Sequence, residues 1–506
     1  MNMPAEALTP RGTLRDLLGG IAEAPNIEFS GISSDSRVLT PGDVFFALVG
    51  ESGHGLDYVN EALEAGVQAV IWDSSADVVA PDHPGVPMIP VVGLTTHIGD
   101  IANRYFDVPS KSMKVAGVTG TNGKTTVSFL VAQCMQMLGN SCAYLGTLGF
   151  GIGALESDGE MTTPACIDLH EKLAAFRDDG AGHAAIEVSS HALQQDRING
   201  VHFDSAIFTN LSRDHIDYHG SMRAYGETKA QLFLDRDVEH RIICIDTDFG
   251  QELADRCGDN VVTVSTRFDR IANGRPFVFV RSVVATEAGS NITVHSSWGK
   301  FDFRLPLPGN FNVANAISVL GLLLSWDVPI VDACEVLSKA SAPPGRMQRV
   351  ADSVAPAVYV DYAHTPAGLE AALRSLRSHC KKSLWCVFGC GGDRDRGKRP
   401  LMGKSAARLA DRLVVTNDNP RSELPGNIIA DVLRGIADKS GAIAIEDRAT
   451  AIAYAIDEAN DDDIVLIAGK GHENYQLIGD QRLAFSDYDA ALANVFARRS
   501  KNVQRQ

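Results

Sequence analysis

Short apolar runs alternate with helix-like segments along almost the whole chain. Runs such as VAGVTG (115–120), AAIEV (184–188), LWCVF (384–388) and IVLIAG (464–469) place apolar residues at successive positions rather than at every second one. A strand has this pattern when both of its faces are buried, as in a parallel sheet covered by helices. The pattern therefore predicts an α/β fold built on parallel sheets.

Two breaks in this alternation predict three domains. The polar stretch PSKSMK (109–114) precedes a buried strand, and Pro343-Pro344-Gly345 cannot continue the helix predicted before it. A chain of 506 residues also exceeds what one hydrophobic core supports. We therefore expect domains at residues 1–108, 109–340 and 341–506.

Composition narrows the class of protein. The net charge of −17 disfavours a nucleic-acid partner, because phosphate-backbone binding needs concentrated lysine and arginine. Nine cysteines without a CxxC pair fit reduced thiols. The N-terminal MNMPAEALTPRG has a proline and charges where a signal peptide needs an apolar core, and no apolar run reaches membrane-spanning length. These features predict a soluble, cytoplasmic chain.

The segment VAGVTGTNGKTT predicts a phosphate-binding loop. It combines a buried strand, a glycine-rich turn and a helix that begins near Lys124. Backbone N–H groups at a helix N-terminus bind phosphate oxygens, Lys124 adds a positive charge, and the Thr125 hydroxyl can reach Mg²⁺. The spacing departs from G-x-x-x-x-G-K-[ST], because Val118 stands five positions before Gly123. The alternative is a tight turn followed by an ordinary surface lysine.

Acidic and imidazole side chains follow two further buried strands. Glu187 ends the strand AAIEV, and the next strand is followed by Asp214, His215, Asp217 and His219. Such ligands at strand ends, in a domain with a phosphate loop, suit a nucleotide-bound Mg²⁺ better than zinc, which would need HExxH or paired cysteines. The alternative is a helix cap formed between Ser212 and Asp217. Lys229 lies in a helical pattern, and a helical lysine is most often solvated.

Three predicted strand ends in the last third of the chain carry polar groups. They are GGDRDRGKR (391–399), DNPRSE (418–423) and GKGHE (469–473). Arginine suits carboxylates, whereas Asp and Asn accept from ammonium groups, so the three loops could bind a zwitterionic amino acid. Three solvated turns are the alternative. Glycine spacing in GCGGDR does not fit the dinucleotide fingerprint, which disfavours NAD.

Taken together, GTNGKTT, EVSSHAL, NLSRDHIDYHG, PGNFNVANA, PPGRMQ, VDYAHTPAGLE, FGCGGDRDRGKRP, DNPR and AGKGHENYQ resemble the Mur ligase family, in order and over nearly the whole chain. The resemblance implies a central P-loop-type ATPase domain with a parallel sheet. An N-terminal α/β domain for a UDP-linked substrate and a C-terminal Rossmann-like domain for the amino acid would flank it.

The resemblance also implies an activity. The chain would be an ATP- and Mg²⁺-dependent ligase that adds meso-diaminopimelate to UDP-N-acetylmuramoyl-L-alanyl-D-glutamate through an acyl phosphate, in peptidoglycan precursor synthesis, as a monomer. Diaminopimelate has a second carboxylate that Arg421 of DNPR could grip, and lysine has none. The open alternatives are an L-lysine-adding ligase, a folylpolyglutamate synthase, a P-loop NTPase without ligase activity, and a UDP-sugar binding module.

The family's functional residues match positions in this chain. The ATP contacts would be Thr119, Gly120, Thr121, Asn122, Gly123, Lys124, Thr125, Asn312, Asn315, Arg346, Asp361 and His364. The metal ligands would be Thr125, Glu187, His215 and Lys229 as a carbamate, and the catalytic residues Lys124, Glu187, His215 and Lys229. The UDP-substrate contacts would be Ser34, Ser36, Glu51, Ser52, Gly53, Met161, Thr162, Thr163, Ser189, Gln195 and Arg197. The amino-acid contacts would be Arg394, Asp418, Asn419, Pro420, Arg421, Gly469 and Glu473. Met161 departs from the family pattern, in which Asn often precedes the two threonines.

Overall fold

A computed structural model describes residues 12–50, 53–75, 78–156, 161–267, 269–270, 274–286, 289–352, 354–438 and 441–505, with side chains up to residue 500. The chain divides into two compact units. The first comprises residues 1–121 and 139–241, and the second comprises residues 122–138 and 242–506. The division falls inside the glycine-rich loop. The three predicted domain ranges stay a prediction.

The first unit begins with a parallel four-stranded sheet, ordered β1-β2-β3-β4. Its strands are β1 (Ile32–Ser33), β2 (Val44–Ala47), β3 (Ala69–Asp73) and β4 (Met88–Val91). The helical segments of this region are α1 (Leu14–Leu17), η1 (Ser36–Val38), η2 (Gly55–Tyr58), α2 (Val59–Glu64), α3 (Leu94–Phe106) and η3 (Pro109–Ser112). Every residue of β2 is buried, as the unbroken apolar run VFFA predicts.

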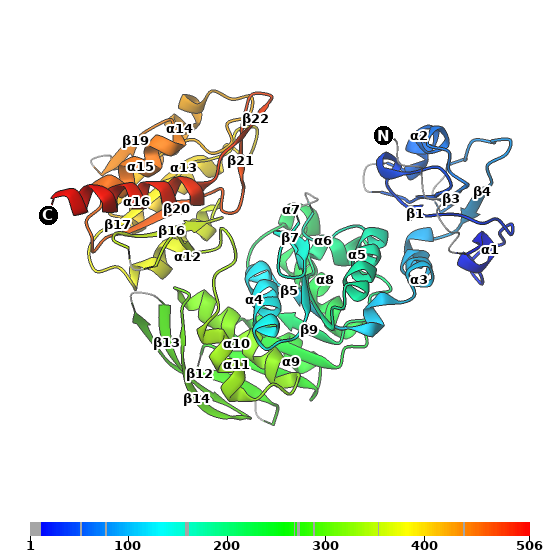
Figure 1. Cartoon of the computed structure of the whole chain (residues 1–506), viewed down its shortest axis with the longest axis horizontal. Helices are drawn as coiled ribbons and strands as arrows, with labels where there is room; N and C mark the ends of the chain where they lie inside the picture. The colour runs from blue at the N-terminus through cyan, green and yellow to red at the C-terminus, as the bar shows by residue number, and fades with distance from the viewer. Residues whose placement is uncertain are drawn as a thin grey trace. The chain divides into compact units, whose positions relative to one another are not determined.

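The strands that follow in the first unit are neighbours in the order β9-β5-β8-β6-β7 (Figure 1, cyan to green). They are β5 (Lys114–Thr119), β6 (Cys142–Gly146), β7 (Gly149–Gly151), β8 (His183–Glu187) and β9 (Ser205–Phe208). β5 runs parallel to β8 and β9, with Val118 opposite Glu187 and Thr119 opposite Phe208. The carboxyl ends of these strands therefore meet at one edge. The helices are α5 (Cys166–Asp178), α6 (Ser190–Gln194), α7 (Ile216–His219) and α8 (Met222–Leu234).

Strands of the second unit are neighbours in the order β14-β13-β12-β11-β10, and β10 begins two residues before that unit does. They are β10 (His240–Cys244), β11 (Val261–Ser265), β12 (Phe277–Thr286), β13 (Gly289–Ser296) and β14 (Gly299–Leu305). β12, β13 and β14 pair antiparallel, so the sheets are mixed rather than wholly parallel as the apolar runs predict. Short connections explain the difference, because a tight turn joins only antiparallel neighbours. The helices are α4 (Lys124–Met137), α9 (Asp248–Arg256), α10 (Asn310–Ser325) and α11 (Ile330–Ser338).

The second unit also contains a six-stranded sheet, ordered β15-β16-β20-β17-β18-β19 (Figure 1, yellow to red). Only the β15–β16 pair is antiparallel. The strands are β15 (Gln348–Arg349), β16 (Ala357–Asp361), β17 (Leu384–Phe388), β18 (Arg412–Val415), β19 (Ala442–Ala444) and β20 (Ile464–Ala468), and a hairpin of β21 (Tyr475–Ile478) and β22 (Gln481–Ala484) follows. The helices are α12 (Pro366–Arg377), α13 (Lys398–Leu409), α14 (Pro425–Leu433), α15 (Arg448–Glu458) and α16 (Asp487–Arg505).

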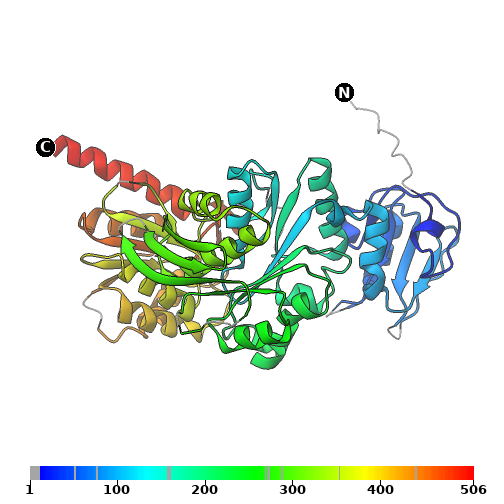
Figure 2. The ribbon, with the colours of Figure 1, turned by 90° about the horizontal axis from the view of Figure 1, so that it is seen from below.

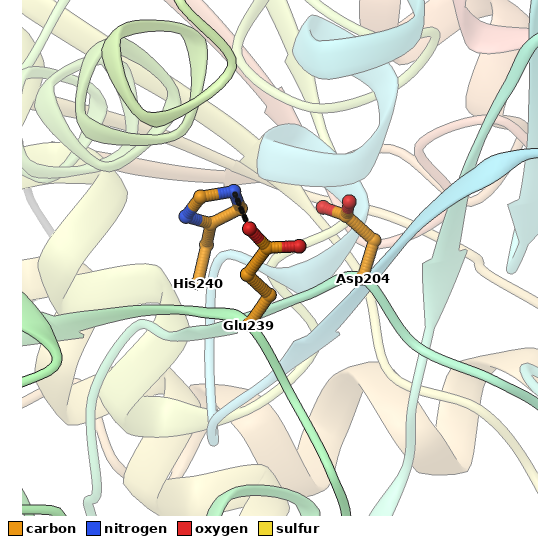
Figure 3. Close-up of side chains that lie close together, drawn as sticks. All are labelled: Asp204, Glu239 and His240. Atoms are coloured by element: carbon orange, nitrogen blue, oxygen red, sulfur yellow. Dashed lines mark ion pairs between the residues drawn. The ribbon is translucent and has the colours of Figure 1, made fainter.

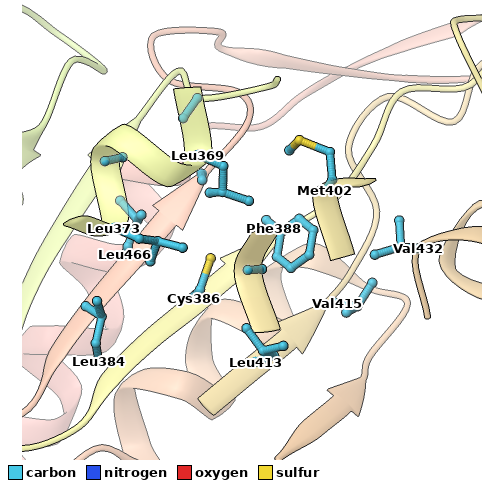
Figure 4. Packing of buried hydrophobic residues seen from close by; sticks show 14 of the residues in the cluster. Leu369, Leu373, Leu384, Cys386, Phe388, Met402, Leu413, Val415, Val432 and Leu466 are labelled. Atoms are coloured by element: carbon cyan, nitrogen blue, oxygen red, sulfur yellow. The ribbon is translucent and has the colours of Figure 1, made fainter. Parts of the chain in front are cut away.

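Alternate side chains of β17 enter two different hydrophobic cores. Leu384, Cys386 and Phe388 pack with residues of α12, α13 and α14 (Figure 4). Trp385 and Val387 pack with residues of α15 and α16 on the other face of the sheet. α16 is the long red helix that ends at the C-terminus in Figure 2. Since side chains alternate between faces, an uninterrupted apolar strand is buried only when helices cover both faces. The predicted α/β class is confirmed.

No helix among the described residues is long and apolar enough to span a membrane. All nine cysteines are free thiols, in agreement with the sequence-based expectation.

Candidate active site

The glycine-rich loop joins β5 to α4 and has the backbone conformation that glycine favours. Gly120 and Gly123 have φ values of +145° and +90°. A Cβ at Gly120 would lie less than 3.0 Å from the Thr209 hydroxyl. α4 begins at Lys124, as predicted, and its N-cap Gly123 provides no side-chain cap. The first N–H groups of α4 are therefore oriented for an anion, and the loop fits a phosphate group.

Two buried asparagines of α10 lie next to Gly123, the loop residue that precedes α4 in the second unit. Asn312 is 2% exposed and Asn315 is 5% exposed. Asn315 Nδ2 donates to Asn312 Oδ1 at 3.3 Å, and Asn312 Nδ2 donates to the Pro308 carbonyl at 2.8 Å. A Cβ at Gly123 would lie less than 3.0 Å from Asn315 Oδ1. A side chain at position 123 would therefore displace the Asn315 amide, so the loop and α10 pack most closely with glycine there.

Glu187 lies at the end of β8 with its carboxylate fully buried. Its Oε1 accepts from the Tyr144 hydroxyl at 2.5 Å and from the Thr147 N–H at 2.9 Å, and Oε2 accepts from the Thr147 hydroxyl at 3.2 Å. Hydrogen bonds to the charged form offset the cost of burying a carboxylate. Sequence reasoning found Glu187 but missed Tyr144, which lies within the buried run CAYLG, and Thr147, which directly follows that run.

His215 belongs to a cluster of imidazole and phenol rings in the first unit. The His215 and His191 rings are edge to face with centroids 4.9 Å apart, and His191 lies 4.1 Å from the Tyr218 ring. His215 is the N-cap of α7 but makes no side-chain cap hydrogen bond, so the helix-cap alternative does not explain it. Burial and the neighbouring cationic groups lower the pKa of His219, which favours its neutral form. Sequence reasoning missed His191.

Lys229 is 1% exposed, so the reading of this residue as a solvated helical lysine is wrong. It lies on the inner face of α8, and its Nζ donates to the Gly120 carbonyl at 3.0 Å and lies 4.4 Å from the centre of the Tyr225 ring. The hydrogen bond joins α8 directly to the glycine-rich loop. Sequence pattern alone could not place the ammonium there.

Four predicted UDP-substrate residues form one polar network in the first unit. The Thr163 hydroxyl donates to the Glu187 carbonyl at 2.7 Å, and the Ser189 N–H donates to Thr163 Oγ1 at 3.2 Å. Arg197 Nη1 donates to the Thr163 carbonyl at 3.0 Å, and Arg197 Nη2 donates to Gln195 Oε1. These side chains are thus fixed beside the strand end that carries Glu187.

The other predicted UDP-substrate residues have separate surroundings. Thr162 Oγ1 lies 3.2 Å from Thr147 Oγ1, and Met161 is 47% exposed. Near β1, the Ser36 hydroxyl donates to Glu61 Oε2 at 2.7 Å, and Ser34 is partly exposed. Gly53 accepts from the Gly50 N–H at 2.9 Å, whereas residues 51 and 52 lie outside the described residues.

In the second unit, Arg346 lies over the Tyr362 ring, 4.5 Å from its centre. Beside them, half-buried Asp361 accepts from the N–H groups of Met347 and Ala363 at 2.7 and 2.9 Å, and desolvation raises its pKa. His364 is exposed, and its Nδ1 lies 2.9 Å from the Tyr362 carbonyl. The structure thus brings three predicted ATP contacts, Arg346, Asp361 and His364, to one place.

Three predicted amino-acid contacts converge after β18 and β20. Asn419 Nδ2 donates to Glu473 Oε2 at 2.9 Å. Arg421 has φ of +52°, and its Nη1 donates to the carbonyls of Gly392 and Asn419 at 2.9 and 3.4 Å. Arg421 Nε and Nη2 have no hydrogen-bond partner among the described residues. These two atoms form the side of the guanidinium that binds a carboxylate in bidentate fashion.

The remaining predicted amino-acid contacts line the same loops. Gly469 has φ of +121°, and a Cβ there would lie 2.7 Å from Asp418 Oδ2. Pro420 is buried, and its carbonyl packs against Gly392 so closely that a Cβ at that glycine would not fit. Arg394 is exposed. Three polar strand ends therefore come together, which the reading as separate solvated turns did not predict.

A different set of possible metal ligands lies where β9 and β10 begin. Asp204, Glu239 and His240 each offer a ligand atom, all within 4.8 Å of one another (Figure 3). The N–H groups of Glu239 and His240 both donate to the Asp204 carbonyl at 3.0 Å. The Glu239 side chain is 75% exposed, as expected for an ordinary surface carboxylate. This cluster lies at the amino ends of the strands, whereas Glu187 lies at a carboxyl end.

Three family models match the chain. They are the Mur ligase family, catalytic domain, over residues 28–106, the Mur ligase middle domain over residues 118–323, and the Mur ligase, glutamate ligase domain over residues 345–471. The middle domain thus starts within β5, and the glutamate ligase domain ends just after β20.

Curated relatives match almost from end to end. The UDP-N-acetylmuramoyl-L-alanyl-D-glutamate–2,6-diaminopimelate ligase of Pseudomonas syringae pv. tomato is 44% identical, over 91% of this chain and 93% of its own length. The ligase of the same name from Coxiella burnetii is 42% identical, over 92% of this chain and 95% of its own.

A solved structure of a ligase with that name has a TM-score of 0.71 and 34% identity, and covers 96% of this chain and 99% of its own. Folylpolyglutamate synthase of Mycobacterium tuberculosis shares the fold at 19% identity with a TM-score of 0.60, over 74% of this chain and 92% of its own. Sequence identity, coverage and fold agree, and the chain belongs to the Mur ligase family.

Proposed function

We propose that this chain is an ATP-dependent ligase that joins meso-diaminopimelate to UDP-N-acetylmuramoyl-L-alanyl-D-glutamate, in peptidoglycan precursor synthesis. The names of its relatives support the reaction, since 44% identity spans nearly all of both chains. The observation that carries the amino-acid specificity is the Arg421 fork. Its Nε and Nη2 are available beside the Asn419–Glu473 pair.

The pocket chemistry favours diaminopimelate over L-lysine. Diaminopimelate has an amino acid centre at each end, so it can present an ammonium to a carboxylate and a carboxylate to the Arg421 fork. A bidentate arginine–carboxylate pair combines two charge-assisted hydrogen bonds with a fixed geometry. Lysine has no second carboxylate, so Nε and Nη2 of half-buried Arg421 would be left without an acceptor, which costs binding energy.

The reaction requires two bond exchanges. An oxygen of the precursor's D-glutamate carboxylate bonds to the γ-phosphorus of ATP while the bond to the bridging β,γ-oxygen breaks, which releases ADP and leaves an acyl phosphate. The amine of the incoming amino acid then bonds to the acyl carbon, phosphate leaves, and the nitrogen loses a proton. Lys124 and the N–H groups at the start of α4 bind phosphate oxygens and stabilise their developing charge.

A divalent cation fits the residues at the strand ends. Buried Glu187 supplies a carboxylate fixed by Tyr144 and Thr147, and oxygen donors of this kind are those that Mg²⁺ prefers. We assign Thr125, Glu187, His215 and carbamylated Lys229 as the groups that hold it. When bound, Mg²⁺ would neutralise negative charge on the transferring phosphate.

The UDP-linked precursor and ATP would bind at the polar clusters described above. Thr163, Ser189, Gln195 and Arg197 would bind the UDP-linked precursor together with Thr162, Ser34, Ser36 and Gly53. Asn312, Asn315, Arg346, Asp361 and His364 would bind the nucleoside of ATP. The nine free cysteines fit a reducing cytoplasm, and we expect a monomer.

Phosphate release by purified protein tests this function. The assay combines ATP, Mg²⁺ and the UDP-linked dipeptide precursor with meso-diaminopimelate or L-lysine, and omits each component in turn. We expect release only with all components and with diaminopimelate. Arg421→Lys should lower kcat/KM for diaminopimelate at least about tenfold, because a lysine cannot bind bidentately. Arg396→Lys, at an exposed arginine of the same region, is the matched control.

Release with L-lysine but not with diaminopimelate would overturn the specificity. Release without the precursor would instead indicate an NTPase, and release with no dependence on any amino acid would exclude the ligase reaction.

A further inference from the structure

Lys470, directly after β20, is a buried lysine that none of the roles above includes. Its side chain is 0% exposed. Burying an ammonium group is costly unless hydrogen bonds and an opposite charge compensate for it. The burial of this ammonium group next to Gly469, among the candidate amino-acid contacts, therefore has to be compensated by its neighbours.

Two pocket residues accept the hydrogen bonds of Lys470. Its Nζ donates to Asn419 Oδ1 at 3.0 Å and to Glu473 Oε2 at 2.9 Å. Since Asn419 Nδ2 also donates to Glu473 Oε2, the three side chains form a closed triangle. The Leu477 N–H donates to Asn419 Oδ1 at 3.0 Å as a second donor on the same oxygen.

These contacts determine which way the Asn419 amide points. Its oxygen faces two donors, Lys470 Nζ and the Leu477 N–H. A rotated amide would place its NH₂ group against both donors and would lose the bond to Glu473. Because Asn419 Nδ2 donates only to Glu473 Oε2 among the described residues, its second N–H is the donor that remains for a ligand oxygen.

The same contacts determine which oxygen of Glu473 is available. Oε2 accepts from both Lys470 and Asn419, whereas Oε1 has no hydrogen-bond partner among the described residues. Oε1 is thus the acceptor left for an ammonium group. Lys470 also balances the charge of Glu473, so the carboxylate can lie in the pocket without a ligand.

We propose that Lys470 is a positioning residue that sets the order of donors and acceptors in the amino-acid pocket. It directs the Asn419 N–H toward a ligand carboxylate and Glu473 Oε1 toward a ligand ammonium, without touching the ligand itself. The inference rests on the proposed function, since it takes Asn419, Arg421 and Glu473 as the pocket for the incoming amino acid.

Steady-state kinetics of Lys470→Met test this role in the full-length protein. Methionine keeps the apolar stem but donates no hydrogen bond. We expect KM for diaminopimelate to rise roughly tenfold to a hundredfold, as for loss of a charge-assisted hydrogen bond, while KM for ATP and for the precursor change less than about twofold. Lys382→Met, at an exposed lysine of the same unit, is the control and should change none of the three constants.

A double mutant separates positioning from a merely structural role. If Lys470 acts through Asn419 and Glu473, then K470M combined with E473Q should raise KM for the amino acid by less than the product of the two single effects, because the two changes disturb the same three side chains. Additive effects, or an equal rise in all three KM values, would overturn the proposal. Should K470M not fold, K470Q takes its place, since an amide can still donate to one of the two oxygens.

The outcomes also separate this proposal from the proposed function. A wild-type enzyme that uses diaminopimelate, with K470M giving the same KM, would overturn the role of Lys470 alone. A wild-type enzyme that requires another amino acid would overturn the diaminopimelate specificity. A selective rise of KM for that other amino acid in K470M would still support the positioning role.

Discussion

Replacing Gly123 by alanine tests whether the loop before α4 binds ATP as we propose. Gly123 and Gly139 flank the same helix, with similar φ values of +90° and +83°. An alanine in this conformation costs about 1–2 kcal/mol at either position. Only Gly123 has a close neighbour, because a Cβ there would contact Asn315 Oδ1, whereas nothing lies within 4 Å of a Cβ at Gly139. Gly139→Ala is therefore a matched control for backbone strain.

The additional cost of Gly123→Ala follows from that contact. Asn315 would have to move by about 1 Å to restore ordinary van der Waals separation. Its 3.3 Å hydrogen bond to Asn312 would then be lost, at about 1 kcal/mol. We expect the free energy of unfolding to fall by about 1–2 kcal/mol in Gly139→Ala and by about 2–3 kcal/mol in Gly123→Ala.

Gly123→Ala and Gly139→Ala should differ more in activity than in stability. A displacement of about 1 Å in a positioning group can lower the rate about 10²-fold. We therefore expect kcat/KM for ATP to fall by about that factor in Gly123→Ala and by less than about twofold in Gly139→Ala. Urea unfolding and phosphate release at saturating precursor and amino acid measure the two quantities. Equal kcat/KM values for the two variants would refute the assignment of the loop to ATP.

Three further predictions follow from buried groups. Glu187→Gln should lower kcat about 10²-fold with a change in unfolding free energy below about 1 kcal/mol, because the amide oxygen still accepts from Tyr144 while the charge is lost; phosphate release and urea unfolding check this. Arg448→Met should lower the unfolding free energy by about 3–5 kcal/mol in urea, because Asp487 would remain buried without its partner, and a loss below 1 kcal/mol would contradict the prediction. Burial lowers the pKa of His472 to about 4 from 6.5, so the unfolded chain binds more protons between these pH values. The free energy of unfolding is therefore highest above pH 6.5, and the contribution of His472 to it falls by about 2 kcal/mol between pH 7 and pH 5. His472→Gln should remove this pH dependence, which urea unfolding at the two pH values measures.

Local sequence determined the elements that carry the chemistry. The apolar runs predict β5, β8, β17 and β20, because a strand covered on both faces must be apolar at successive positions. The glycine-rich turn before a helix predicts the loop at Gly120 to Gly123, since positive φ there depends on the residue type itself. Polar residues directly after buried strands likewise indicated Glu187 and Asn419, because the carboxyl ends of parallel strands share one edge.

Tertiary structure alone decided what those residues contact. Tyr144 and Glu187 are 43 positions apart, and Lys470 and Asn419 are 51 positions apart, so no local pattern relates them. The burial of Lys229 could not be predicted either, because a helical pattern does not show how deeply the inner face of the helix is buried. Sequence periodicity reports which faces are apolar, whereas the orientation of a side chain and the identity of its partner depend on how distant segments pack. The sequence by itself therefore determined the fold class, the loop and the candidate residues, and the packing of distant segments decided which atoms of those residues face a ligand.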